Sequence, residues 1–333
     1  MKNLHKMLFL MLTMTGTMIA VSSNSWVMMW VGLEINLLSI IPLLTNVNNK
    51  MESEAAMKYF IAQALASAML LFSIIMMEEN SMLPTMVNNT IMDCAVLTKM
   101  GAAPFHFWFP EVMEGLSWMA STLMLTWQKI APMVIFLYQP KLTTLTIVVI
   151  ISSMMISGLM GINQTSLRKI LAYSSINHIG WMIGAMISNQ SIWMIYLVVY
   201  IMMTVNITAM LNMNNIFTMQ QMINSENEKK IKILFHMNFL SLGGLPPFTG
   251  FIPKWITINE MINSNMFLLT VMMIVMTLMT LMFYMRITIT ALTLSETKMN
   301  SKTPPHKNLY MLMNSNFLVL MVLPLSSMML NII

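Results

Sequence analysis

The sequence has few charged residues and a single cysteine, and each shortage excludes a class of protein. Charged residues make up 9% of the 333 positions, whereas soluble domains carry about 25%, so a soluble fold is excluded. The single cysteine, Cys94, excludes internal disulfides and argues against an iron–sulfur or cysteine-ligated metal site. The sequence also lacks a catalytic triad, a phosphate-binding glycine loop and a dinucleotide fingerprint. The chemistry that remains is the movement of protons or cations.

Long apolar segments take up most of the chain. Hydrophobic residues make up 57% of it, and the mean hydropathy is +0.71. The segments are about 20 residues long, which is typical of membrane-spanning helices rather than barrel strands. We predict an all-α integral membrane protein with about eleven transmembrane helices in one polytopic domain, residues 1–333, and no cleavable signal. The expected spans are roughly residues 4–22, 25–45, 57–77, 91–110, 118–138, 142–161, 168–188, 191–211, 231–262, 266–287 and 309–331.

The basic residues fall mostly on one side of the predicted membrane. If the N terminus lies on side A, the side-A segments hold 13 of the 17 basic residues, and side B holds Lys141 alone. Lys99, Lys129 and Lys254 fall within the spans. By the positive-inside rule, side A is the cytoplasm or the equivalent compartment of an organelle. An odd number of spans then places the C terminus on side B.

Two of the predicted spans, about residues 91–116 and 231–262, are broken by glycine and proline. A proline has no N–H group and clashes with the preceding turn, so the helix is expected to break there. Residues 101–111 and 244–254 share the pattern G-x-x-P-F-x-x-x-x-P followed by a charged residue, at an offset of 143. Broken helices at matching positions are typical of transporter sites. Because glycine and proline are common in membrane helices, a chance match is the alternative.

The offset of the two motifs predicts an inverted repeat. Corresponding spans lie five helices apart, and since five is odd, they cross the membrane in opposite directions. We therefore predict halves at about residues 1–140 and 141–290, followed by a C-terminal helix at 309–331. The same offset places Glu34 at the position of Asn177, which precedes His178.

Glu34 and Lys99 are predicted to interact within the membrane. Both lie in apolar surroundings near the middle of a span, where an unpaired charge is costly. Burial disfavours a charged ammonium group and a nearby carboxylate favours it, so moving Glu34 relative to Lys99 would load or release a proton. The alternative is a static ion pair that locks two helices together.

Two further lysines and two histidines complete the predicted relay. Lys129 lies in a span three residues before Pro132, and Lys254 follows the second break. His106 and His178 could connect the lysines, because a neutral imidazole accepts a proton at one nitrogen and donates at the other. The alternatives are a lysine that snorkels to the interface at 254 and histidines that only pack.

Several long motifs resemble a known family. They are GLEINLLSIIPLL, KMGAAPFHFWFPEV, TWQKIAP, NQTSLRKILAYSSINHIGWM and FLSLGGLPPFTGFIPKW. Together they resemble subunit 2 of NADH dehydrogenase (ubiquinone), the mitochondrially encoded, antiporter-like family of the membrane arm of respiratory complex I, in its insect or arthropod form. The resemblance extends over essentially the whole chain. It also implies a mitochondrial code that reads AUA as methionine, which would explain the 47 methionines.

The resemblance implies a function as a subunit of a proton-translocating NADH:ubiquinone reductase. Its proton-carrying residues fall on Glu34, Lys99, Lys129 and Lys254, and all four are present. It implies no cofactor in this chain, with FMN, iron–sulfur clusters and ubiquinone in partner subunits. The expected location is the mitochondrial inner membrane, with the N terminus in the matrix and the C terminus in the intermembrane space. The expected partners are the other core and accessory subunits of the membrane arm and inner-membrane phospholipids, with no nucleic acid and no soluble substrate.

Two other functions remain compatible with the residues alone. A free-standing cation/proton antiporter would dissipate an ion gradient by itself, without a redox partner. A structural spacer would conduct nothing. Moving one charge against 100 mV requires about 2.3 kcal/mol, and no redox or nucleotide site in the sequence could supply it. A pumping function therefore requires partner subunits.

Overall fold

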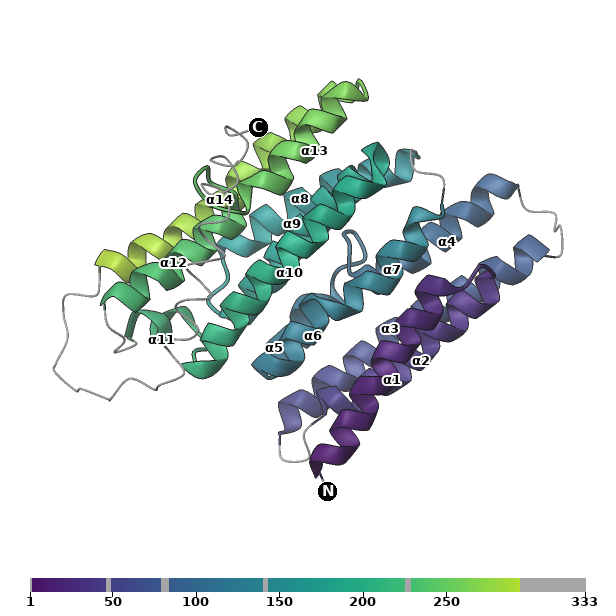
Figure 1. Cartoon of the computed structure of the whole chain (residues 1–333), viewed down its shortest axis with the longest axis horizontal. Helices are drawn as coiled ribbons and strands as arrows, with labels where there is room; N and C mark the ends of the chain where they lie inside the picture. Colours follow the sequence, from purple (N-terminus) through teal and green to yellow (C-terminus); the bar gives the residue numbers. More distant parts are fainter. Residues whose placement is uncertain (1, 46–48, 79–83, 140–142, 225–228, 294–333) are drawn as a thin grey trace, which may run out of the picture. The chain divides into compact units, whose positions relative to one another are not determined.

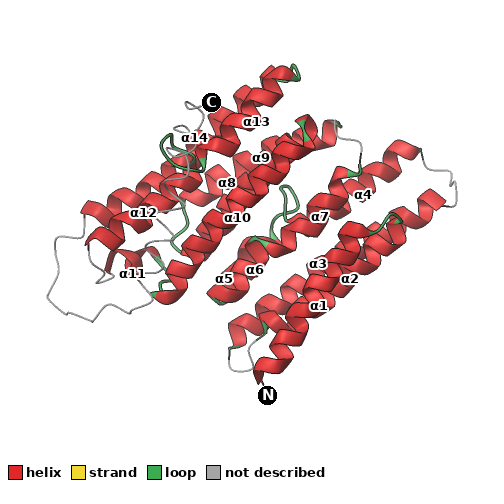
Figure 2. Ribbon diagram, viewed as in Figure 1, coloured by secondary structure: helices red, strands yellow, loops and turns green. Residues whose placement is uncertain are grey.

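A computed structural model describes residues 2–45, 49–78, 84–139, 143–224 and 229–293 of the chain. Within these ranges the chain is helical and contains no strand (Figure 2). The nearest approach to a sheet is one isolated antiparallel bridge between Ser166 and Thr218. The all-α fold expected from the apolar segments is confirmed for these residues.

The chain divides into two compact units, Met1–Val149 and Ile150–Ile333, and α8 (Thr144–Ile162) crosses the boundary between them. The first unit contains α1 (Lys2–Ser22), α2 (Trp26–Leu44), α3 (Lys50–Glu78), α4 (Thr85–Met100), α5 (Trp108–Gly115), α6 (Trp118–Leu125) and α7 (Trp127–Leu137) (Figure 1). The second contains α9 (Leu167–Ser188), α10 (Gln190–Met213), α11 (Met219–Asn224), α12 (Lys229–Gly243), α13 (Phe251–Asn263) and α14 (Phe267–Thr293). In the first unit, α3 packs against α2, α4 and α5, and α7 packs against α4.

Eight candidate membrane spans occur among the described residues. Most lie close to their predicted positions, because uninterrupted apolar sequence sets the length of a spanning helix. The bounds of α2 differ from prediction by one residue at each end, and those of α9 by one residue at the start only. In contrast, α3 starts at Lys50 rather than at 57, because its polar first turns continue the helix beyond the apolar segment. The predicted helix at 309–331 lies outside the described residues.

The predicted span at 118–138 consists of two helices that meet at Thr126. The backbone of Thr126 (φ −112°, ψ −71°) departs from helical values, and α7 begins at the next residue. The Thr126 hydroxyl donates to the carbonyl of Thr122 at 2.6 Å, a bond that is known to bend helices. The joint lies here and not at Pro132, which is inside α7. It places Lys129 in the first turn of α7.

Glycines allow α1 and α2 to pack closely. A Cβ atom added at Gly32 would lie 2.6 Å from the backbone nitrogen of Ala20, and one at Gly16 would lie 2.9 Å from that of Asn36. Small residues at such contacts allow helix backbones to approach one another in membranes, where close packing drives association. This contact fixes the position of α2, which carries Glu34.

α4 and α12 end in the same way, although they belong to different units. Gly101 (φ 76°) follows α4, and Gly244 (φ 80°) follows α12, both with left-handed backbone. At each end the glycine N–H bonds the carbonyl three residues before it, and the next N–H bonds the carbonyl five residues before its own position. Left-handed backbone favours glycine, which has no Cβ. The two motifs therefore share a helix-ending geometry as well as a sequence pattern.

Candidate functional site

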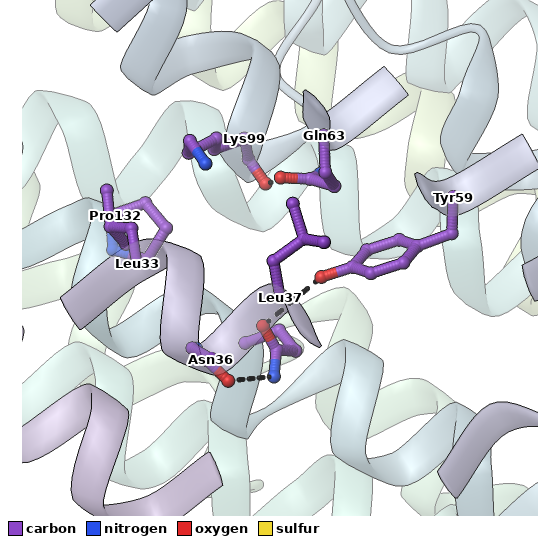
Figure 3. Close-up of a pocket in the computed structure, with 8 residues that line it drawn as sticks. Leu33, Asn36, Leu37, Tyr59, Gln63, Lys99 and Pro132 are labelled. Atoms are coloured by element: carbon purple, nitrogen blue, oxygen red, sulfur yellow. Dashed lines mark hydrogen bonds between the residues drawn. The ribbon is translucent and has the colours of Figure 1, made fainter. Parts of the chain in front are cut away.

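A small polar cavity lies beside Lys99 in the first unit (Figure 3). Its volume is about 10 Å³, which is the lower limit of what one water molecule needs. Helices α2, α3, α4 and α7 supply its lining: Leu33, Asn36, Leu37, Tyr59, Gln63, Lys99, Gln128 and Pro132. Five of these eight side chains are polar, so the cavity suits a water molecule rather than an apolar ligand.

Lys99 lies in the last turn of α4 and is 7% exposed. Its ammonium group interacts electrostatically with Glu34 on α2. No salt bridge within 4 Å joins the two residues in the described part of the chain, and the buried Oε1 of Glu34 has no hydrogen-bond partner there. The predicted partners thus interact across space without direct contact.

A chain of hydrogen bonds connects three helices on one side of this cavity. The Tyr59 hydroxyl donates to Gln128 Oε1 at 3.4 Å, and Gln128 Nε2 donates to Asn36 Oδ1 at 2.8 Å (Figure 3). Gln63 Nε2 donates to the carbonyl oxygen of Lys99 at 3.4 Å. Sequence reasoning missed these residues. The available signal was polarity inside apolar spans: Asn36 follows Glu34 by two residues, and Gln128 precedes Lys129.

Lys129 and His106 are also buried in the first unit. Lys129 on α7 is 3% exposed, and its Nζ lies 5.8 Å from the centre of the Phe109 ring, within the range of a cation–π interaction. His106 lies between α4 and α5 and is 3% exposed. Its Nδ1 lies 3.3 Å from the Pro104 carbonyl oxygen, and since a carbonyl only accepts, Nδ1 carries the hydrogen.

Lys254 is enclosed by the second unit. It is 6% exposed, and its Nζ donates to the carbonyl of Gly243 at 2.7 Å, at the C-terminal end of α12. Positive charge is favoured at the C terminus of a helix. Trp181 on α9 lies below the ammonium group, 5.9 Å from its ring centre. The alternative of a lysine that snorkels to the interface is not supported, because Lys254 is buried while the adjacent Trp255 is 57% exposed.

His178 lies on the same helix as Trp181 and is 1% exposed. Its Nδ1 is 2.9 Å from the Tyr196 hydroxyl, and the Tyr200 ring lies 5.0 Å away. Asn177, the residue aligned with Glu34, donates from Nδ2 to Thr280 Oγ1 at 3.4 Å. The six predicted residues are therefore divided: Glu34, Lys99, His106 and Lys129 belong to the first unit, and His178 and Lys254 to the second.

Sequence reasoning also missed Asp93, which is 0% exposed on α4. It stands outside the recognised motifs, and only its acidity within a predicted span could have singled it out.

No group of three or more histidine, cysteine or acidic residues that could hold a metal occurs among the residues that the structure describes. The candidate residues in each unit are thus buried ionisable and amide side chains between apolar helices.

Such a site within a polytopic helical bundle defines a membrane protein that handles protons or small cations. Residues 23–280 match the family described as NADH:quinone oxidoreductase/Mrp antiporter, transmembrane. The chain belongs to this family.

Two insect relatives are similar over most of their length. NADH-ubiquinone oxidoreductase chain 2 of Anopheles gambiae is 46% identical over 293 residues, which are 86% of each chain. That of Aedes aegypti is 42% identical over 332 residues, which are 96% of each chain.

The fold is similar to that of a chain of respiratory complex I from Thermus thermophilus, with a TM-score of 0.83. The two chains are 22% identical, and the match covers 95% of this chain and 77% of that one. A chain of the Mrp complex from Dietzia has a TM-score of 0.72, with 84% and 59% of the two chains covered.

Proposed function

We propose that this chain is a membrane-arm subunit of mitochondrial NADH:ubiquinone oxidoreductase, respiratory complex I, and that it translocates protons across the inner membrane. It acts as part of that enzyme, while electrons pass from NADH to ubiquinone in other subunits. The observation that carries the proposal is the burial of Lys99, Lys129 and Lys254, each at most 7% exposed, in a chain of this family. Buried lysines in membrane helices mark ion or proton pathways.

In this function Glu34 controls the charge on Lys99. When the carboxylate approaches, it stabilises the ammonium form, and when it withdraws, burial favours release of the proton. Lys129, His106, His178 and Lys254 are the further proton carriers. The cavity has room for one water molecule and is lined by the side-chain amides of Asn36, Gln63 and Gln128. It provides the polar environment through which a proton leaves Lys99.

The inverted repeat belongs to the proposal as well. We assign α4 with α5, and α12 with α13, as two interrupted crossings of opposite direction, within halves at about 1–140 and 141–290. Their matching helix ends at Gly101 and Gly244 support this assignment. The charge distribution places the N terminus in the matrix and the C terminus in the intermembrane space.

Partner subunits supply the driving force for the proposed pump. FMN, iron–sulfur clusters and ubiquinone bind to partner subunits of the complex. Within the membrane arm, the partners of this chain are the other core subunits and the accessory subunits. Inner-membrane phospholipids cover the exposed apolar side chains. A free-standing antiporter is less well supported, since relatives at 42% to 46% identity are named as one chain of an NADH-ubiquinone oxidoreductase.

Replacing Lys99 with methionine tests this function. Methionine is unbranched and only one atom shorter than lysine, but it cannot carry a proton. In membrane vesicles with the assembled complex, Lys99→Met is expected to retain assembly and electron transfer while fewer protons move per NADH oxidised. An unchanged proton yield would indicate a structural spacer and contradict the proposal.

Lys58→Met provides the matched control. Lys58 lies on α3, forms salt bridges of 3.1 Å to Glu54 and Glu111, and has a side chain that is 44% exposed. Exposed ion pairs contribute little to stability, so the proton yield should remain unchanged.

A second experiment tests the antiporter alternative. If the purified chain alone dissipated a cation gradient in liposomes, it would be an antiporter and not a subunit that depends on partners.

A further inference from the structure

Asp93 is a buried acid without a partner. It is 0% exposed, and neither carboxylate oxygen has a hydrogen-bond partner in the described structure. The other buried or half-buried acids of the first unit differ, because Glu52 accepts a bond from Asn49 at 3.2 Å and Glu34 interacts with Lys99. The burial of Asp93 arises within this chain, so it does not depend on a partner subunit.

A packing role does not account for an acid at this position. An ionised carboxylate without a partner is costly to bury, so the group is most stable with a proton bound. Even a neutral acid leaves its donor and acceptor unsatisfied, whereas methionine or leucine would fill the same space at no such cost. A buried ionisable group in a membrane helix marks a functional pathway by default.

The position of Asp93 on α4 relates it to Lys99. Six residues separate the two, which corresponds to a rise of about 9 Å along the helix and a difference of about 120° around it, so the two side chains do not share a face and a proton passes between them only through water. Helical side chains lean towards the N terminus, so the ammonium group of Lys99 lies closer to the level of Asp93 than its backbone does. Asn88, 4% exposed and with an unpartnered Oδ1, lies further along α4 in the same direction. Buried polar groups thus occur at three levels of α4, at Lys99, Asp93 and Asn88, between its C-terminal turn and its start at Thr85.

The balance between buried lysines and buried acids in the first unit is a second argument for a role of Asp93. Two lysines, Lys99 and Lys129, are buried in its helices. Glu34 can balance the charge of one of them, and Asp93 is the second acid within the bundle, since Glu52 lies in the first turn of α3. With Asp93 included, protons can move between two acids and two lysines without a lasting net charge in the interior.

We propose that Asp93 is a second proton-binding carboxyl group of the first unit, and that it takes the proton leaving Lys99 towards the N-terminal end of α4. Asp93 first releases its own proton towards that end. An N–H bond of the Lys99 ammonium then breaks, the electron pair stays on nitrogen, and a chain of water molecules relays the proton to the Asp93 carboxylate, where an O–H bond forms. Both side chains are then neutral. This role rests on the proposed proton-translocating function.

Asp93→Asn tests the role, because asparagine has nearly the same volume as aspartate but is neutral and does not take up or release a proton near neutral pH. In vesicles with the assembled complex, the variant is expected to retain NADH oxidation and to lower the proton yield per NADH as far as Lys99→Met does. Asp93→Glu, which restores a carboxyl group, should recover part of the yield. Glu54→Gln removes an exposed acid on α3 and should have no effect.

The outcomes separate this role from the proposed function. If Lys99→Met lowers the yield and Asp93→Asn does not, Asp93 is a packing residue and the inference fails while the proposed function stands. If neither variant lowers the yield, the proposed function itself fails. An infrared difference spectrum between the wild-type complex and Asp93→Asn provides a readout without turnover. The spectrum is expected to contain one carbonyl band of a protonated carboxylic acid. The absence of this band would mean that Asp93 is ionised at rest, which contradicts the proposed order of proton transfers.

Discussion

At the scale of single residues, the structure gives each buried lysine a different environment. Lys99 faces a polar cavity, Lys129 lies over an aromatic ring, and Lys254 bonds a helix-terminal carbonyl. The sequence singled out these three lysines, and all three are buried, because a charge in an apolar segment is visible in the sequence itself. It could not predict their partners. The Gly243 carbonyl, for example, reaches Lys254 only because the chain turns sharply at Gly244.

Gly244 and Gly243 provide a matched test of the Lys254 environment. A Cβ atom at Gly244 would lie 2.8 Å from Lys254 Cδ on left-handed backbone, whereas one at Gly243 meets Tyr284 at an ordinary 3.4 Å. Gly244→Ala should therefore destabilise the subunit by about 1–2 kcal/mol and displace the ammonium group from the Gly243 carbonyl. Gly243→Ala should have a much smaller effect. Thermal unfolding of the assembled complex compares the two, and equal losses would contradict this account.

At the scale of elements, the sequence predicted where most apolar helices lie but not how they meet. The positions and lengths of the apolar segments predicted the bounds of α2 and α9 to within one residue. The joint between α6 and α7 was missed because neither glycine nor proline stands at Thr126, and Pro132 lies inside α7. Asp93 was missed for a related reason, since its burial results from packing between helices and not from any local motif.

The α1–α2 contact leads to a prediction at this scale. At Gly32 an added methyl group would collide with the backbone of Ala20, which cannot move as a side-chain end can. Gly32→Ala should force the helices apart and lower the amount of assembled complex. Leu38→Ala, at a 61% exposed position on the same helix, should assemble normally. The abundance of the assembled complex on a native gel measures both variants, and normal assembly of Gly32→Ala would show that the close contact is dispensable.

At the scale of the whole molecule, apolar side chains cover much of the described exterior. Exposed examples on α14 are Leu268 (84%), Met282 (67%) and Leu278 (59%). In water such a surface would be unfavourable, but in a bilayer it is the required one. The composition of the sequence predicted this correctly, because 9% charge leaves too few polar residues for a water-facing surface.

Leu278 allows the apolar exterior to be tested. It lies near the middle of α14, where a lysine costs about 2.5–3.5 kcal/mol on insertion scales. Leu278→Lys should therefore reduce membrane insertion and assembly, while Leu278→Met should leave both unchanged. Carbonate extraction of membranes followed by immunoblotting measures the inserted fraction. Full insertion of the lysine variant would mean that this position faces water or protein and not lipid.

The size of the cavity beside Lys99 has a consequence for ionic selectivity. A proton can pass through a space that holds one water molecule, because it moves by the exchange of hydrogen bonds. A sodium ion needs several oxygen ligands around it at the same time, and a cavity of about 10 Å³ has no room for a hydrated ion. Selectivity in narrow membrane pathways depends on such limits of size and coordination. This cavity would thus admit a water molecule and exclude a hydrated metal cation, without a dedicated filter.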